Sequence, residues 1–192
     1  IETWAPKAKL IVGMSLGGLT TVALAGMRPD LASKIVVVDI TPGVNSEKSK
    51  AITDFVNGPQ SFASFEELLK RTIEHNPTRS ESSLRRGILH NAKQLEDGSW
   101  QWRYDRSTHP SKEDSAKRLD RISALWGVIE SLKSSMTLVR GGISPVVDDA
   151  DVAELLRRKP DAEVLVIDGA GHSVQGDKPV ELASALTRML RG

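Results

Sequence analysis

A serine between glycines is the feature of this chain best suited to chemistry. Residues 13–18 read Gly-Met-Ser-Leu-Gly-Gly, after a continuous apolar run and before an alanine-rich, helix-forming stretch. The pattern predicts a strand that turns sharply into a helix and projects Ser15 at the corner. We expect a Cβ at Gly13 or Gly17 to clash with nearby backbone. The helix start favours developing negative charge, with the amide of Leu16 as candidate oxyanion donor. The alternative is an ordinary turn whose serine caps the helix.

A serine hydroxyl is a poor nucleophile unless a neighbouring base takes its proton. Of the four histidines, His172 stands in Gly-Ala-Gly-His-Ser, between an apolar run and the last helix-forming stretch. It is therefore the candidate base, and its alternative role is that of a surface or helix-capping histidine. The other three lie in a helical stretch and are more typical of surface or packing positions: His75, His90 and His109.

The elements that must position these residues alternate between strand and helix. Continuous apolar runs predict buried strands, and amphipathic or alanine-rich stretches predict helices between them. The strands are expected at 10–12, 35–39, 136–139 and 163–167, and the helices at 16–27, 149–158 and 179–190. This order predicts an α/β fold with a mostly parallel sheet. Since the carboxyl ends of parallel strands meet at one edge, Ser15, Asp39, Ser144 and His172 are expected there together.

The middle of the chain differs from the rest in composition and in the spacing of its apolar residues. Apolar residues recur there at helical spacing, charges are dense, and three of the four tryptophans fall within it. We therefore expect a helical insertion without strands at 45–132, with a polar turn at 97–98, between two parts of the core at 1–44 and 133–192.

Four segments together resemble the α/β-hydrolase family. They are Gly-Met-Ser-Leu-Gly-Gly at 13–18, Val-Val-Asp-Ile-Thr-Pro at 37–42, Arg-Gly-Gly-Ile-Ser-Pro at 140–145 and Gly-Ala-Gly-His-Ser at 169–173. The resemblance implies a serine hydrolase that cleaves a carboxylic ester or similar acyl bond, with the insertion as its cap. Carbon–carbon bond hydrolysis or perhydrolysis on the same scaffold, or a non-catalytic binding protein, are the alternatives.

The acid that orients the histidine has more than one candidate in the sequence. The commonest family pattern places it in a Gly-x-x-Asp turn, where this chain has Ser144. A subgroup of small bacterial esterases has its acid in a Val-Asp-Ile-x-Pro strand end. The resemblance to that subgroup implies Asp39 as the acid, with Ser144 as an accessory hydrogen-bond partner of His172. Asp148 is the alternative acid, although its position is typical of a helix cap. The alternative role of Asp39 is purely structural, namely to hold its own loop in place.

Composition limits the partners. The net charge is +1, from 26 basic and 25 acidic residues, which gives no reason to expect nucleic acid. The chain has no apolar run long enough for a membrane span. It has no cysteine, which fits a cytoplasmic location. We expect a small-molecule acyl substrate and no metal or organic cofactor. The family resemblance also implies further strands before Ser15. An N-terminal segment, as part of a longer chain or as a second chain, is therefore the other expected partner.

Overall fold

A computed structural model describes residues 1–104 and 112–191 of the chain. Two compact units make it up: Ile1–Lys48 with Glu113–Gly192, and Ser49–Lys112. The second unit is shorter than the insertion expected at 45–132. The difference arises because Trp126 and Ile129 are buried in the same apolar cluster as Leu19 of the first unit. Helical periodicity alone does not tell which core a helix packs against.

The first unit contains a four-stranded parallel sheet in the order β1-β2-β6-β7. Its strands are β1 (Ile11–Met14), β2 (Lys34–Val38), β6 (Ser135–Gly141) and β7 (Glu163–Ile167). The register pairs Met14 with Val38 and Val38 with Val139, so three of the strands finish side by side. This confirms the expected α/β fold and brings the residues after these strands to one edge.

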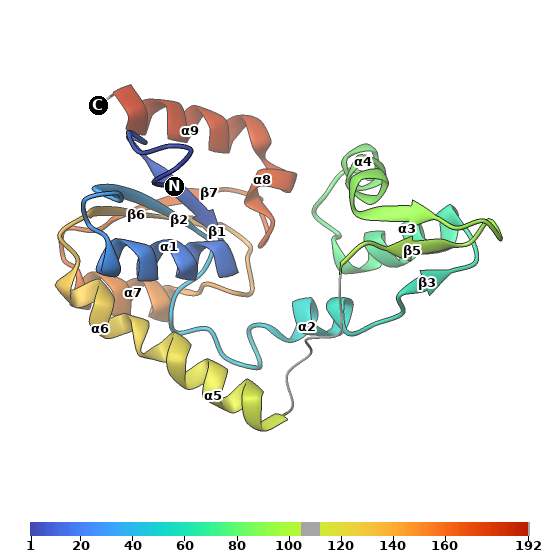
Figure 1. Cartoon of the computed structure of the whole chain (residues 1–192), viewed down its shortest axis with the longest axis horizontal. Helices are drawn as coiled ribbons and strands as arrows, with labels where there is room; N and C mark the ends of the chain where they lie inside the picture. Colours follow the sequence, from blue (N-terminus) through green and yellow to red (C-terminus); the bar gives the residue numbers. More distant parts are fainter. Residues whose placement is uncertain (105–111, 192) are drawn as a thin grey trace. The chain divides into compact units, whose positions relative to one another are not determined.

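Helices cover both faces of this sheet (Figure 1). An apolar cluster on one face includes residues of α1 (Leu16–Met27), α6 (Leu125–Ser131) and α7 (Asp149–Arg158). The cluster on the other face includes Val174 of the short helix α8 (Val174–Asp177) and Leu182 of α9 (Pro179–Arg191). Strand β2 is covered on both sides, because Ile35 and Val36 point to opposite faces and both are fully buried. Helix α5 (Lys112–Ser123) precedes α6.

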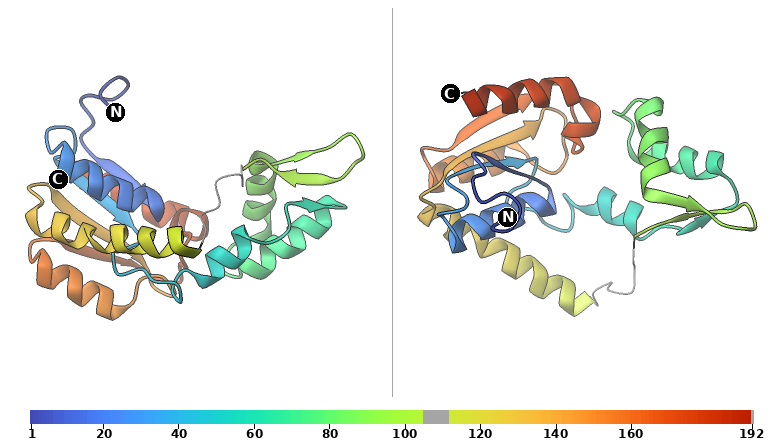
Figure 2. Two further views of the ribbon diagram at one scale, coloured as in Figure 1. Left: turned by 60° about the horizontal axis from the view of Figure 1, so that its bottom comes forward. Right: turned by 45° about the horizontal axis from the view of Figure 1, so that its top comes forward.

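The second unit contains strands that the sequence analysis did not predict. Its helices are α2 (Lys50–Val56), α3 (Phe65–His75) and α4 (Glu81–Asn91). The strands β3 (Ser61–Phe62), β4 (Ala92–Gln94) and β5 (Trp100–Trp102) form an antiparallel sheet in the order β3-β5-β4 (Figure 2). Segments of two or three residues are too short to show an alternating pattern, so the expectation of no strands was wrong. The expected turn at 97–98 joins β4 to β5, and Gly98 has a φ of 83° there.

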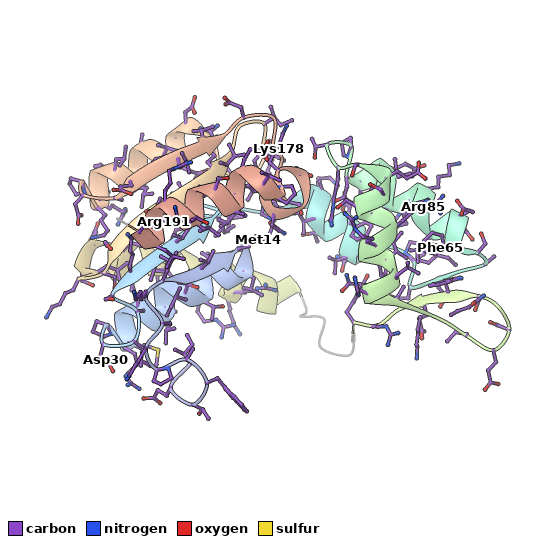
Figure 3. The ribbon with its side chains drawn as sticks, turned by 90° about the horizontal axis from the view of Figure 1, so that it is seen from above. Met14, Asp30, Phe65, Arg85, Lys178 and Arg191 are labelled. Atoms are coloured by element: carbon purple, nitrogen blue, oxygen red, sulfur yellow. The ribbon has the colours of Figure 1, made fainter. Side chains whose placement is uncertain are left out.

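This second unit has its own apolar core. Leu68, Leu84 and Ile88 are almost fully buried, beside Phe62 and Trp102 of the small sheet. The core is extended at the surface by a cation–π contact, in which the guanidinium carbon of Arg85 lies 5.5 Å from the ring centroid of Phe65 (Figure 3). Across both units, no helix among the described residues has the length and apolarity that crossing a membrane requires.

Candidate active site

Ser15 lies at the sharp corner between β1 and α1. Its backbone has φ 51° and ψ −124°, a conformation that non-glycine residues rarely adopt. Its amide donates to the carbonyl of Val38 at 3.0 Å, so the corner is anchored to the neighbouring strand. The hydroxyl of Ser15 lies against the imidazole of His172 and does not cap α1. The arrangement therefore differs from that of an ordinary capping serine.

The glycines around Ser15 have unequal roles. A Cβ at Gly13 would lie 2.3 Å from the carbonyl oxygen of Gly17, so this position requires glycine. A Cβ at Gly17 would meet nothing within 4 Å, so the expected clash there was wrong. The tight position is instead Gly18, where a Cβ would lie 2.7 Å from a side-chain carbon of Ile40. The missing side chain at Gly18 thus allows α1 to pack closely on β2, and the missing side chain at Gly13 allows the tight corner.

The first amides of α1 are placed beside the Ser15 hydroxyl by helix geometry. The amides of Gly18 and Leu19 donate to the carbonyl of Ser15 at 2.8 and 3.2 Å. The amides of Leu16 and Gly17 precede this ladder and point out of the end of the helix, as the first donors of every helix do. Exposed amides of this kind, together with the positive end of the helix dipole, favour negative charge near the start of a helix.

The imidazole of His172 bridges Ser15 and Asp39. Its Nε2 lies 3.0 Å from the Oγ of Ser15, and its Nδ1 lies 2.9 Å from Oδ2 of Asp39. The carboxylate accepts a hydrogen bond from Nδ1–H, which leaves Nε2 free to accept the proton of the hydroxyl. The ring is mostly buried, with 16% of the side chain exposed. Residues from three separate strand ends therefore form one hydrogen-bonded chain.

Asp39 is fully buried, and its carboxylate is surrounded by donors. The amide of Gly141 donates to Oδ1 at 2.8 Å, while His172 and the hydroxyl of Ser144 both donate to Oδ2. Its own amide donates to the carbonyl of Val139 at 2.8 Å. Burying a carboxylate is costly unless donors compensate it, and three hydrogen bonds do so here. The carboxylate is thus held in place next to the imidazole by hydrogen-bond donors.

Ser144 has a partner other than the expected one. The sequence analysis expected its hydroxyl to bind the imidazole of His172, but it donates to the carboxylate of Asp39. The amide of Val146 in turn donates to the Oγ of Ser144 at 3.1 Å, which fixes the hydroxyl in the turn after β6. The link between Ser144 and His172 therefore runs through the carboxylate that both of them bind.

Asp148, the alternative acid, is engaged at the start of α7. Its side chain accepts from the amide of Asp151 at 2.9 Å and forms a capping box with that residue. The Nζ of Lys48 lies 2.9 Å from its Oδ2, and this hydrogen bond lowers the pKa of Asp148 to about 2. These contacts are those of a helix cap, as its position in the sequence indicated.

The other three histidines belong to the second stretch of the chain, Ser49–Lys112, and not to the unit that contains the cluster. The Nδ1 of His75 lies 3.0 Å from the carbonyl oxygen of Arg71, within the second unit, and His90 is exposed in the last turn of α4. His109 lies outside the described residues. Within the described part of the chain, no group of three or more histidine, aspartate or glutamate residues is arranged to hold a metal ion.

Two residues of the site were not found from the sequence. The amide of Gly141 binds the acid, and the carboxylate of Asp177 accepts from the amide of Gly171, next to His172, at 2.8 Å. The Gly-Gly pair at the end of β6 was a signal for the first, since a close backbone approach favours glycine. An aspartate five residues after a histidine gave no signal for the second.

The sequence also matches a known family. The model of the alpha/beta hydrolase family matches residues 3–185. The chain belongs to the α/β-hydrolase family. This confirms the resemblance drawn from the four segments of the sequence and agrees with the parallel sheet and strand-end site.

The individual relatives are hydrolases. The chain is 39% identical over 195 residues to esterase Rv0045c of Mycobacterium tuberculosis, covering 98% of this chain and 61% of that protein. A solved structure of that esterase superposes with a TM-score of 0.80 at 37% identity, over 100% of this chain and 65% of that one. The sn-1-specific diacylglycerol lipase ABHD11 of Mus musculus is 28% identical, over 94% of this chain and 58% of that protein. The α/β-hydrolase chain thus spans about three fifths of the length of these relatives.

Proposed function

We propose that the protein is a serine hydrolase that cleaves a carboxylic ester or a similar acyl bond. The observation that carries the proposal is the continuous hydrogen-bonded chain from the Oγ of Ser15 through the imidazole of His172 to the carboxylate of Asp39. A hydroxyl, a base and a buried acid in this order are the requirements for nucleophilic catalysis by serine. The position of Ser15 at the first free amides of α1 adds stabilisation for an oxyanion.

In the proposed mechanism each residue has its own step. The Oγ of Ser15 attacks the carbonyl carbon while Nε2 of His172 takes the hydroxyl proton, and the oxyanion accepts from the amide of Leu16. His172 then gives that proton to the departing alcohol, which leaves an ester between Ser15 and the acyl group. Water attacks this acyl-enzyme as His172 takes its proton, and return of the proton to Ser15 releases the acid. Asp39 holds the ring tautomer and stabilises the imidazolium throughout.

The names of the relatives support the ester as substrate. One is an esterase and another is a lipase specific for a diacylglycerol position, and both names describe carboxylic ester hydrolysis. Carbon–carbon bond hydrolysis and perhydrolysis would use the same nucleophile and base, so they remain the alternative reactions for this scaffold. We also propose that the second unit, Ser49–Lys112, is the cap of this hydrolase and contributes to substrate selection.

Labelling with a fluorophosphonate probe tests the proposal directly. The natural protein that carries this chain should acquire one adduct on Ser15, identified by peptide mass spectrometry. Ser15→Ala should abolish the adduct, and His172→Ala should slow its formation because the hydroxyl loses its base. A folded protein that remains unlabelled would favour the non-catalytic alternative.

A substrate screen separates ester hydrolysis from the two alternative reactions, carbon–carbon bond hydrolysis and perhydrolysis. Acyl esters of graded chain length should be cleaved with a kcat/KM that depends on chain length and vanishes in Ser15→Ala. A β-diketone and a perhydrolysis assay with hydrogen peroxide serve as the comparison reactions. Faster turnover in either of these than with any ester would replace the ester assignment.

A further inference from the structure

The loop that carries His172 is held by a carboxylate outside the hydrogen-bonded chain of the site. The amide of Gly171, the residue before His172, donates to Oδ2 of Asp177 at 2.8 Å. Asp177 is the last residue of α8, the single helical turn that follows the histidine. Because the accepting group is a carboxylate, this bond is stronger than one to a neutral acceptor.

Asp177 is itself fixed on several sides. Its amide donates to the carbonyl of Ser173 at 2.9 Å, and the amide of Lys178 donates to the carbonyl of Val174 at 2.9 Å. Val174 is fully buried in the apolar cluster beneath α9, so the helical turn is anchored to the sheet unit. The second carboxylate oxygen, Oδ1, is buried as well. The acceptor thus has little freedom to move.

The same loop also contacts the end of β6, where the amide of Gly141 binds the acid. A Cβ at Gly141 would lie 2.3 Å from the carbonyl oxygen of Gly171, so the two backbones are in direct contact. The amide of Ile143 also donates to the carbonyl of Ala170 at 3.0 Å. The Gly171 residue is therefore held both by Asp177 and by Gly141, whose amide binds Asp39.

We propose that Asp177 is a positioning residue for His172, and this rests on the function proposed above. By fixing the amide of Gly171, its carboxylate sets the backbone direction from which the imidazole reaches both Ser15 and Asp39. Loss of the acceptor lets the loop relax, and Nε2 and Nδ1 then no longer meet both partners at once. Catalysis is sensitive to displacements of this size, since a misplacement of about 1 Å can cost about 100-fold in rate.

The experiment compares three substitutions in the natural protein that carries this chain. Asp177→Ala removes the acceptor and should lower kcat by about 10- to 100-fold with little change in KM. Asp177→Asn keeps a carbonyl oxygen that can accept from Gly171 and should restore most of the activity. Asp168→Ala is the matched control, because Asp168 is an exposed carboxylate in the same loop. Asp177→Ser, whose shorter side chain moves the accepting oxygen away from the amide of Gly171 but stays polar, replaces the alanine variant if that variant does not fold.

A readout that needs no substrate separates this proposal from the proposed function. The ring proton between Nδ1 of His172 and Asp39 gives a downfield proton NMR signal, which Asp177→Ala should weaken and Asp168→Ala should leave unchanged. If the natural protein hydrolyses no ester but this signal depends on Asp177, the positioning role stands and the proposed function falls. A folded Asp177→Ala variant with unaltered kcat and an unaltered ring signal would overturn the positioning role.

Discussion

Ser15 and Asp39 share an uncommon backbone conformation, each with a φ of 51° and each directly after a strand. The two strands are neighbours, and Met14 pairs with Val38 in their register, so the two residues leave the sheet side by side. A positive φ in a non-glycine residue typically costs about 1–3 kcal/mol and persists only where the surroundings enforce it. Here a positive φ occurs both at the candidate nucleophile and at the candidate acid. Both bind His172 through their side chains.

The strain at Ser15 can be measured with a pair of substitutions. Ser15→Gly and Ser15→Ala both remove the hydroxyl, but only glycine tolerates φ 51° and ψ −124° without strain. We expect the glycine variant to be the more stable of the two by about 1 kcal/mol, after the entropic cost of glycine is subtracted. Urea unfolding of both variants gives the difference. Equal stabilities, or a more stable alanine variant, would contradict the strain.

The identity of the acid is tested by a matched pair of amide substitutions. Asp39→Asn should lower kcat by about 10⁴-fold, because the amide favours the wrong tautomer of His172 while leaving the geometry in place. Asp148→Asn should leave kcat nearly unchanged, because asparagine still caps α7. Steady-state kinetics on an acyl ester, with a circular dichroism spectrum of each variant, measures both effects. The reverse pattern, an active Asp39→Asn and an inactive Asp148→Asn, would transfer the role of the acid to Asp148.

The contribution of Ser144 follows from its hydrogen bond to the acid. Ser144→Ala removes one of the three donors to a fully buried carboxylate, which costs about 1–3 kcal/mol of stability for a bond to a charged group. We expect a corresponding fall in the melting temperature and a smaller loss of kcat than in Asp39→Asn. Ser173→Ala provides the control for removing a serine near the histidine, because the Ser173 hydroxyl is partly buried and accepts from the side chain of Gln175. A Ser144→Ala variant as stable as the parent would show that the remaining donors suffice.

Much of the sheet unit was predictable because its signals are local. The apolar run before Gly13 and the β-branched run 35–38 each give a strand where the structure has one, and α1 spans the residues that were expected. The convergence of Ser15, Asp39 and His172 at one edge followed from the topology of parallel strands alone. These features depend on residue type and order, which the sequence states directly.

The features that could not be predicted depend on contacts between distant segments. The turn after β6 places the hydroxyl of Ser144 against the carboxylate of Asp39 and not against the ring of His172. The segment after residue 112 packs with the sheet unit because of where Trp126 is buried, and periodicity does not reveal that. The carboxylate of Asp177 binds a backbone amide, and a backbone partner leaves no trace in the pattern of side chains.

The unequal roles of the glycines at the corner give a further prediction. Gly13→Ala should prevent the corner from closing, because its Cβ would lie 2.3 Å from the backbone oxygen of Gly17. Gly17→Ala should be tolerated and should stabilise α1 by up to about 1 kcal/mol, since alanine favours the helix. Thermal unfolding and fluorophosphonate labelling of both variants measure the outcome. If Gly17→Ala unfolds the protein as Gly13→Ala does, the space beside Gly17 cannot hold a Cβ, and the difference between the two glycines is contradicted.

The ion pair between Asp148 and Lys48 predicts a dependence of stability on pH. The hydrogen bond from Lys48 lowers the pKa of Asp148 to about 2, below the value of near 4 that an aspartate has in an unfolded chain. The folded state therefore binds fewer protons, so this contribution is complete above about pH 4 and is lost as the pH falls through 2.

In Asp148→Asn the residue does not titrate, and the free energy of unfolding should fall less steeply between pH 5 and 2. Urea unfolding at successive pH values measures the two slopes. Asp168→Asn serves as the control, because Asp168 is an exposed aspartate outside this ion pair. Identical slopes for the parent and Asp148→Asn would show that the pair with Lys48 does not hold the carboxylate ionised.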